Sequence, residues 1–169
     1  PRLHNNRAVF RKSIYIGCVI ASFMLPGMPS IYYGDENLID GEMGSVEASR
    51  YPMCWDESRW DMDTHEAYKR MGELRKLPFI PYSSLRIESI DNEAFMIARF
   101  SRNNAVLSII NRCPRKRNVS VNLFALPSDS AVLWYGNGSL SIKDRFLEAD
   151  LPAEESIVVL LSGGSLPTA

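Results

Sequence analysis

The 169-residue chain carries almost no net charge, and its cysteines are few. A formal charge of −1 gives no general attraction to nucleic acid or to an anionic membrane, so we expect neither as a partner. The three cysteines, Cys18, Cys54 and Cys113, are scattered and odd in number, which excludes a disulfide framework and favours a reducing, cytoplasmic compartment. Their spacing does not resemble a metal site, and the sequence indicates neither a metal nor a cofactor.

The sequence also lacks a hydrophobic run long enough to span a membrane. Its apolar stretch from Ile14 to Leu25 follows three basic residues, which is the layout of a signal peptide or a short anchor. The stretch is shorter than the roughly 20 residues that a spanning helix needs, and it ends at Pro26. We therefore predict a helix over residues 5–25, capped by Asn5 or Asn6 and buried on most sides inside a larger domain.

What is present is the composition of a folded globular protein, with 46% hydrophobic and 23% charged residues. Residues 1–78 follow the order helix, strand, irregular loop, helix. Asp63 and Glu66, three residues apart, indicate a capping box at the start of the second helix. The predicted elements are the helix 5–25, a short apolar strand 29–34, the irregular segment 35–62 and the helix 64–77.

The periodicity changes after Pro78, and residues 79–169 are predicted to form a separate domain. Short apolar runs alternate with polar residues and are separated by turns rich in Asn, Asp, Gly, Pro and Ser. About eight strands at this spacing predict an antiparallel β-sandwich over residues 82–162. The runs are Leu85–Ile87, Ala94–Phe100, Val106–Ile110, Val119–Leu123, Val132–Tyr135, Leu140–Ile142 and Ile157–Leu161.

The strand predicted at residues 29–34 cannot stand alone, because its backbone groups need neighbouring strands on both sides. Residues 1–77 therefore look like part of a barrel or sheet whose other strands are not in this chain. The unpartnered strand and the apolar helix would leave an open edge and an exposed apolar surface. From this we expect a homo-oligomer with residues 1–35 in the contact.

Two motifs resemble a known family. The first is "LPGMPSIYYGDEN", residues 25–37, and the second is "SRYPMCWDES", residues 49–58. They resemble the end of the catalytic barrel in glycoside hydrolase family 13, the α-amylase family, and most closely its neopullulanase, cyclomaltodextrinase and maltogenic amylase branch. That branch reads G-x-P-x-I-Y-Y-G-D-E and then R-x-P-M-x-W-D. The matching residues here are Gly27, Pro29, Ile31, Tyr32, Tyr33, Gly34, Asp35 and Glu36, then Arg50, Pro52, Met53, Trp55 and Asp56.

The resemblance implies an α+β chain, made of the last helix–strand–helix piece of a (β/α)₈ barrel and a C-terminal antiparallel β-sandwich domain. Active sites of such barrels lie at the C-terminal ends of the strands, where Gly34 would let the chain turn. The substrate implied is an α-glucan oligosaccharide. The substrate-binding residues implied are Tyr33, Asp35, Glu36, Arg50 and Trp55, and the acids are expected to orient neighbouring groups.

The family's chemistry is retaining glycoside hydrolysis, which uses a carboxylate nucleophile and a carboxylic acid that flank the scissile bond. The resemblance places both on earlier barrel strands, so this chain is expected to be a C-terminal fragment of a glycosidase and inactive alone. One position departs from the branch, because Val46 stands where an aspartate helps to hold a donor-side sugar. The exact activity of the parent enzyme stays open.

Simpler interpretations stay open for each of these residues. Asp35 and Glu36 could form a plain acidic turn, Arg50 could be a surface ion-pair partner, and Trp55, like Trp60, could be hydrophobic cover. His65 is expected to be solvated. An alternative function is a stand-alone carbohydrate-binding or protein-interaction β-sandwich module, for which Tyr135 and the adjacent Gly-Asn-Gly turn are the candidate contacts.

Overall fold

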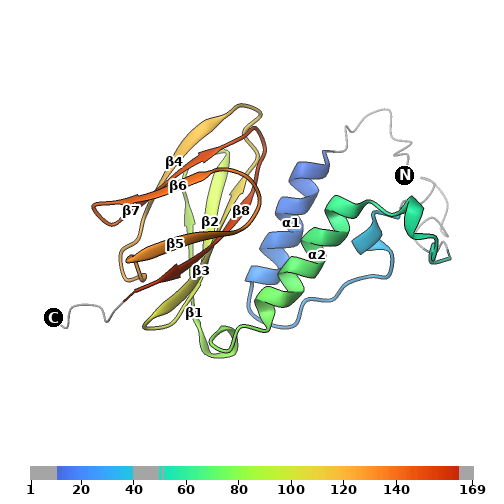
Figure 1. The fold of residues 1–169 in the computed structure, drawn as a ribbon, viewed down its shortest axis with the longest axis horizontal. Coiled ribbons are helices and arrows are strands. Elements are labelled where there is room, and N and C mark those ends of the chain that lie inside the picture. Colours follow the sequence, from blue (N-terminus) through green and yellow to red (C-terminus); the bar gives the residue numbers. More distant parts are fainter. Residues whose placement is uncertain (1–10, 40–49, 51, 164–169) are drawn as a thin grey trace.

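The computed structural model of the protein describes residues 11–39, 50 and 52–163. Within this part of the chain, two α-helices lie against a sandwich of eight strands (Figure 1). The helices are α1 (Lys12–Met24) and α2 (Met62–Arg75), and three 3₁₀ turns are η1 (Asp35–Asn37), η2 (Glu57–Arg59) and η3 (Ile80–Tyr82). The strands are β1 (Ser84–Ser89), β2 (Ala94–Phe100), β3 (Asn104–Asn111), β4 (Arg117–Asn122), β5 (Ser130–Tyr135), β6 (Ser139–Lys143), β7 (Phe146–Leu151) and β8 (Ile157–Ser162).

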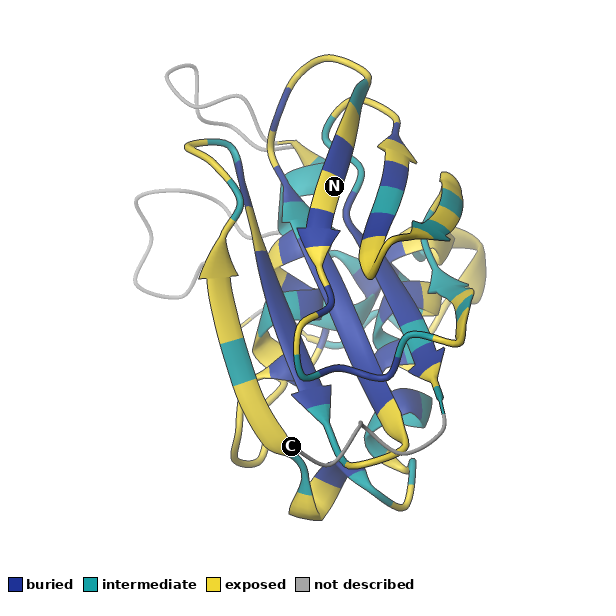
Figure 2. Ribbon diagram, turned by 90° about the vertical axis from the view of Figure 1, so that its left-hand side faces the viewer, coloured by how far each residue is buried: buried dark blue, intermediate teal, exposed yellow. Residues whose placement is uncertain are grey.

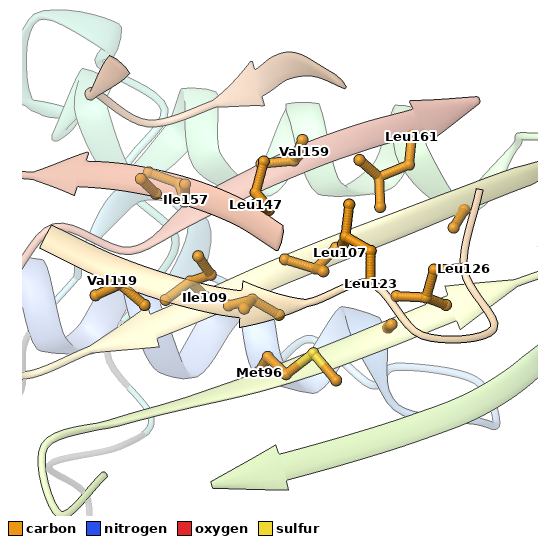
Figure 3. Packing of buried hydrophobic residues seen from close by; sticks show 14 of the residues in the cluster. Met96, Leu107, Ile109, Val119, Leu123, Leu126, Leu147, Ile157, Val159 and Leu161 are labelled. Carbon is orange, nitrogen blue, oxygen red and sulfur yellow. The ribbon is translucent and has the colours of Figure 1, made fainter. Parts of the chain in front are cut away.

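The strands form two antiparallel sheets, which confirms the predicted α+β class. The larger sheet has the order β1-β2-β3-β8-β5, and the smaller one has the order β4-β7-β6. Strand β7 is absent from the predicted runs, although Leu147, Ala149 and Leu151 alternate inward along it. A single core fills the space between the sheets (Figure 3). Its residues include Met96, Leu107, Ile109, Val119, Leu123, Leu126, Leu147, Ile157, Val159 and Leu161.

The larger sheet is buried on its second face as well, because both helices pack there. Ile97, Val106 and Val158 point to that face and share a second apolar cluster with α1 and α2. Arg70 of α2 lies 4.0 Å over the ring of Trp134 in β5 and donates to the Trp134 carbonyl at 2.8 Å. Burial on two faces explains why the central strands are almost continuously apolar, whereas the edge strand β1 is nearly all exposed (Figure 2). The protein therefore has three layers, helices, sheet and sheet.

Helix α1 ends one residue before the predicted end, and arginines from other elements satisfy its last carbonyls. Leu25 precedes Pro26, which disfavours helical geometry, and it is extended with φ −70° and ψ 153°. Arg75 donates to the carbonyls of Phe23 and Leu25, each at 3.2 Å. The N-terminal part of the predicted helix, residues 5–10, lies outside the described residues.

Helix α2 begins earlier than predicted, and the capping box assigned to Asp63 and Glu66 is wrong. Asp61 is the N-cap residue, with extended backbone angles, and its carboxylate accepts a hydrogen bond from the Thr64 amide at 3.0 Å. Asp63 instead lies in the first turn, where it pairs with Lys12 at 2.5 Å. The capping position was misassigned by two residues because both acids suit a helix start.

The strand predicted at residues 29–34 is not formed in the structure. Residues 28–32 have neither helix nor strand geometry, and residues 33–34 form a turn. A strand exists only through its partners, and no described strand lies beside this segment. The boundary between two domains at residues 78 and 79 stays a prediction. No helix among the described residues is long and apolar enough to cross a membrane.

Candidate substrate-binding face

The segment between α1 and α2 turns sharply at Gly34. Gly34 has a left-handed φ of +92°, and a Cβ there would lie 2.9 Å from the Ile39 side chain. The Gly34 carbonyl accepts hydrogen bonds from the amides of Asn37 at 3.1 Å and Ile39 at 2.9 Å. These bonds join the residues before and after η1. This confirms the predicted turn, because a residue with a side chain would be strained at this φ.

The two acids of the turn have different surroundings. The Glu36 carboxylate accepts from the Gly34 amide at 2.9 Å, and it therefore helps to fix the turn. Burial raises the pKa of Asp35, and the neighbouring charge of Glu36 raises this pKa further. The carbonyl of Asp35 accepts from the Tyr15 hydroxyl at 3.3 Å, and that hydroxyl lies 3.0 Å from the Tyr68 hydroxyl. Tyr15 of α1 thus contacts the turn directly, and Tyr68 of α2 is linked to the turn through Tyr15.

Tyr33 lies at the surface just before Gly34, where the charge of Arg50 acts on it. The ring centroids of Tyr33 and Tyr32 are 4.6 Å apart, and both side chains are half exposed. A hydrogen bond with Tyr32 raises the pKa of Tyr33. The positive charge of Arg50 lowers this pKa and so offsets part of the rise. Arg50 itself is exposed. These two predicted residues are therefore close enough to interact electrostatically.

Trp55 makes no described contact with Tyr33 or Arg50. Its side chain is 80% exposed, and no hydrogen bond or ring contact joins it to another described residue. Trp60, by contrast, is partly buried, and its indole donates to the Cys54 carbonyl at 2.8 Å. Trp60 therefore fits the hydrophobic-cover interpretation, and the role of Trp55 stays a prediction. The predicted departure at Val46 lies outside the described residues.

The sequence analysis missed two residues that tie η1 to α2. Asn37 is buried, and its side-chain oxygen lies 2.8 Å from Nδ1 of His65. The His65 ring stacks on Trp60 with centroids 5.1 Å apart, so the prediction that His65 is solvated is wrong. Asn37 also accepts from the Asp61 amide at 3.3 Å. The residues are 28 positions apart, and only the position of His65 next to the helix start could have suggested the contact.

The predicted site residues together carry aromatic rings, two carboxylates and one guanidinium. Such groups suit a polar ligand with hydroxyls, because carboxylates accept hydrogen bonds and aromatic rings cover apolar ring faces. Within the described residues no group of three His, Cys, Asp or Glu side chains could hold a metal ion.

Comparisons with known proteins agree with the motifs. No family profile matches the chain. The chain is 27% identical over 163 residues to a cyclomaltodextrin glucanotransferase of Klebsiella oxytoca, with 91% of this chain and 24% of that protein covered. The chain thus spans about a quarter of the length of this curated relative.

Solved structures share the fold. An α-amylase of Anoxybacillus superposes with a TM-score of 0.75 and 19% identity, covering 93% of this chain and 34% of that one. A maltogenic amylase of S. marinus superposes with a TM-score of 0.62 and 22% identity, covering 91% and 20%. In fold and in sequence, the chain matches the C-terminal part of enzymes of the α-amylase family, as its two motifs predicted.

Proposed function

We propose that the chain is the C-terminal part of an α-glucan-acting glycosidase of the retaining type. In this proposal α1 is the seventh helix of a (β/α)₈ barrel, residues 29–34 are its eighth strand, and α2 is its eighth helix. The β-sandwich is the C-terminal domain. The observation that carries the proposal is the position of the "SIYYGDEN" motif between two helices, in a chain whose relative is a cyclomaltodextrin glucanotransferase.

The exposure of the segment before Gly34 supports the barrel assignment. Met28 is 92% exposed, and Ile31, Tyr32 and Tyr33 are each about half exposed. Apolar residues gathered in this way on a soluble surface usually mark a contact site. Neighbouring barrel strands would cover these side chains. They would also form the backbone hydrogen bonds that residues 29–34 need in order to become a strand.

The proposed substrate-binding residues are Tyr33, Asp35, Glu36, Arg50 and Trp55. Tyr33 and Arg50 would contact the sugar chain from one side of the turn, and Trp55 would offer an exposed ring for stacking. Glu36 would act mainly through the turn, because its carboxylate is bonded to the Gly34 amide. These are roles in binding an α-glucan oligosaccharide.

The chain alone is proposed to be inactive. Retaining hydrolysis needs two carboxyl groups about 5 Å apart on opposite sides of one sugar linkage. Asp35 and Glu36 lie in a single 3₁₀ turn, and Asp56 and Glu57 are likewise adjacent, so neither pair can flank a sugar ring. The purified chain should release no reducing ends from maltodextrin, pullulan or cyclodextrin. Turnover that follows the protein through purification and is lost on mutating one of its acids would refute the proposal.

The decisive experiment is to sequence the DNA upstream of the Pro1 codon and to express the whole reading frame. We expect a product that hydrolyses maltodextrin, in which Arg50→Ala weakens transition-state binding by about 1–3 kcal/mol, the scale of a hydrogen bond to a charged group. A reading frame without further barrel strands, or a product without α-glucan activity, would overturn the proposal. An unchanged kcat/KM in the Arg50 variant would make Arg50 a structural residue only.

The alternative of a stand-alone β-sandwich module has less support. It relied on Tyr135 as an exposed aromatic residue of the sandwich. Tyr135 is instead half buried and packs against the apolar cluster that the larger sheet shares with the helices, so it does not offer a contact surface that belongs to the sandwich alone.

A further inference from the structure

A cavity lies between the start of both helices and two loops of the sandwich. Its volume is about 460 Å³, which is large enough for a sugar of one or two rings. Both helices begin at the top of Figure 1, next to the loops that close the sandwich on that side. The loops are the β5–β6 turn, with Gly136 and Asn137, and the β7–β8 loop, with residues 154–156.

The sandwich side of the cavity is held rigidly. Gly136 has a left-handed φ of +90°, and a Cβ there would lie 2.6 Å from the Ser156 carbonyl, so only glycine allows the two loops to touch. The carboxylate of Glu155 accepts from the Asn137 amide at 2.7 Å and from the Asn137 side chain at 3.1 Å. The wall is therefore preformed, which lowers the entropy cost of binding a ligand.

The helix side is tied to the same loops by ion pairs and hydrogen bonds. Ser13 donates to the Glu154 carboxylate at 2.8 Å, and Arg11 pairs with the other oxygen of that carboxylate. Lys12 pairs with Asp63 at 2.5 Å and with Asp61 at 3.2 Å. Most charges around the cavity are thus neutralised in pairs, although no ion pair joins Glu66 to a described residue.

Tyr135 supplies the aromatic ring of the lining, and the charges of three carboxylates act on it. Burial raises the pKa of Tyr135 to about 12, and the charges of Glu155, Asp63 and Glu66 contribute to the rise. Ile16 and Met62 add apolar surface to the lining. The cavity therefore combines hydrogen-bond acceptors from several elements with one aromatic ring and a few apolar side chains.

This combination fits a pyranose ring better than a cation. Sugar hydroxyls can donate to free carboxylate oxygens, and the C–H face of the ring can lie on a tyrosine. A metal ion is disfavoured, because the described carboxylates form no group of three that could hold one. An organic cation would find Asp63 and Glu154 already paired with Lys12 and Arg11.

We propose that this cavity is a second, non-catalytic binding site for a pyranose unit of a neutral oligosaccharide. Tyr135 would contact the ring face, and Glu66 and Glu155 would accept hydrogen bonds from its hydroxyls. The choice of an α-glucan as the oligosaccharide rests on the proposed function. The site itself is separate from the face formed by Tyr33, Asp35 and Arg50.

The test is a titration of the whole chain with maltotriose, followed by backbone amide NMR. We expect saturable shifts at Gly136 and Asn137 with a Kd on the order of 1 mM. Glu66→Gln and Tyr135→Leu should each weaken this binding about fivefold or more, since the first replaces a charged acceptor by a weaker neutral one and the second removes the aromatic ring on which the sugar would lie. Glu148→Gln is the matched control, because Glu148 lies on the smaller sheet outside the cavity, and it should bind like the wild type.

Three results would overturn the inference. One is the absence of saturable shifts up to about 20 mM maltotriose, a concentration far above the expected Kd. Another is equal binding of putrescine at the same amides, which would make the site cationic. The third is binding that Trp55→Ala abolishes and Glu66→Gln leaves unchanged. That result would favour the proposed function while refuting this second site, so the two proposals fail separately.

Discussion

Arg99 is a buried cation that forms no ion pair with a carboxylate of the described residues. It is 5% exposed, and its guanidinium donates to the Ile80 carbonyl at 2.8 Å and to the Ser83 hydroxyl at 2.9 Å. Longer contacts reach the carbonyls of Met24 and Leu25, at the C-terminal end of α1. Burial lowers the pKa of Arg99, and the nearby charge of Arg75 lowers this pKa further. A cation in this place is favoured by the negative end of the helix dipole.

Arg99→Met should therefore lower the free energy of unfolding by about 2–4 kcal/mol, because it keeps the packing of the stem and leaves several carbonyls without a donor. Urea unfolding followed by circular dichroism measures the change. Arg99→Lys is the control, and it should lose less because it keeps the charge. A Met variant within about 0.5 kcal/mol of the wild type would contradict this role.

Asp91 links the β1–β2 turn to β4. The pKa of Asp91 is lowered to about 2, chiefly by a hydrogen bond from Arg117 and also by one from the amide of Glu93. The Asp91 carboxylate accepts from the amides of Glu93 at 2.7 Å and Ala94 at 2.9 Å. A pKa below the usual 3.8 means that the charged form stabilises the fold above about pH 4, and that this stabilisation is lost as the pH falls toward 2.

Asp91→Asn should cost about 1 kcal/mol or less at pH 7, because the Asp91 side chain is 39% exposed and solvent weakens the pair. The difference from the wild type should persist down to about pH 4 and close by about pH 2. Urea unfolding at a series of pH values measures it. A difference that stays constant over this range would show that the charge of Asp91 plays no part.

At the scale of elements, two glycines should respond in opposite ways to the same substitution. Gly136→Ala should destabilise the protein by about 2 kcal/mol or more, because φ is positive and the new Cβ would meet a backbone carbonyl. Gly72→Ala in α2 should stabilise it by about 0.5–1 kcal/mol, because a Cβ there meets nothing within 4 Å and alanine favours helix. Thermal or urea unfolding of both variants tests the pair, and equal effects would be inconsistent with the turn geometry.

The elements that could be predicted from the sequence are those that carry their own signal. The strands alternate, so most of the sandwich followed from residues such as Val119 and Val121. Residues 29–34 do not form the predicted strand in this chain, since a strand depends on partners that local sequence does not contain. The sequence prediction placed the N-cap of α2 at Asp63 and not at Asp61, although an aspartate just before a helix is a common start signal.

The candidate site could be predicted only where its contacts join residues that are close together in the sequence. The turn at Gly34 followed from its sequence, and the structure keeps Asp35 and Glu36 together in η1. The contact of Asn37 with His65 joins residues 28 positions apart and could not be read from periodicity. The same holds for the cavity beside Tyr135, since four separate segments build it.

At the scale of the whole molecule, the exposed segment before Gly34 predicts self-association. We expect a dimer or a higher oligomer with residues 1–35 in the contact, because Met28 and Ile31 leave apolar surface uncovered. Light scattering at about 10–50 µM tests this, a range that detects weak association. Ile31→Lys should shift the protein toward monomer, whereas Phe124→Lys, at an exposed residue of the sandwich, should not. A wild-type chain that stays monomeric would contradict the prediction.

The three-layer arrangement also bears on the order in which the chain can fold. The surface under α1 includes Val158 of β8, and Ser13 bonds to Glu154, 141 residues further along. Helix α1 packs on α2, β2 and β3 as well, but its contacts with β8 and with the β7–β8 loop form only after these late segments have been made. Contacts of such long sequence separation slow folding, because the chain must close large loops before they form. During synthesis, part of the apolar face of α1 would therefore stay uncovered until β8 is made, and such exposed apolar surface is what chaperones bind.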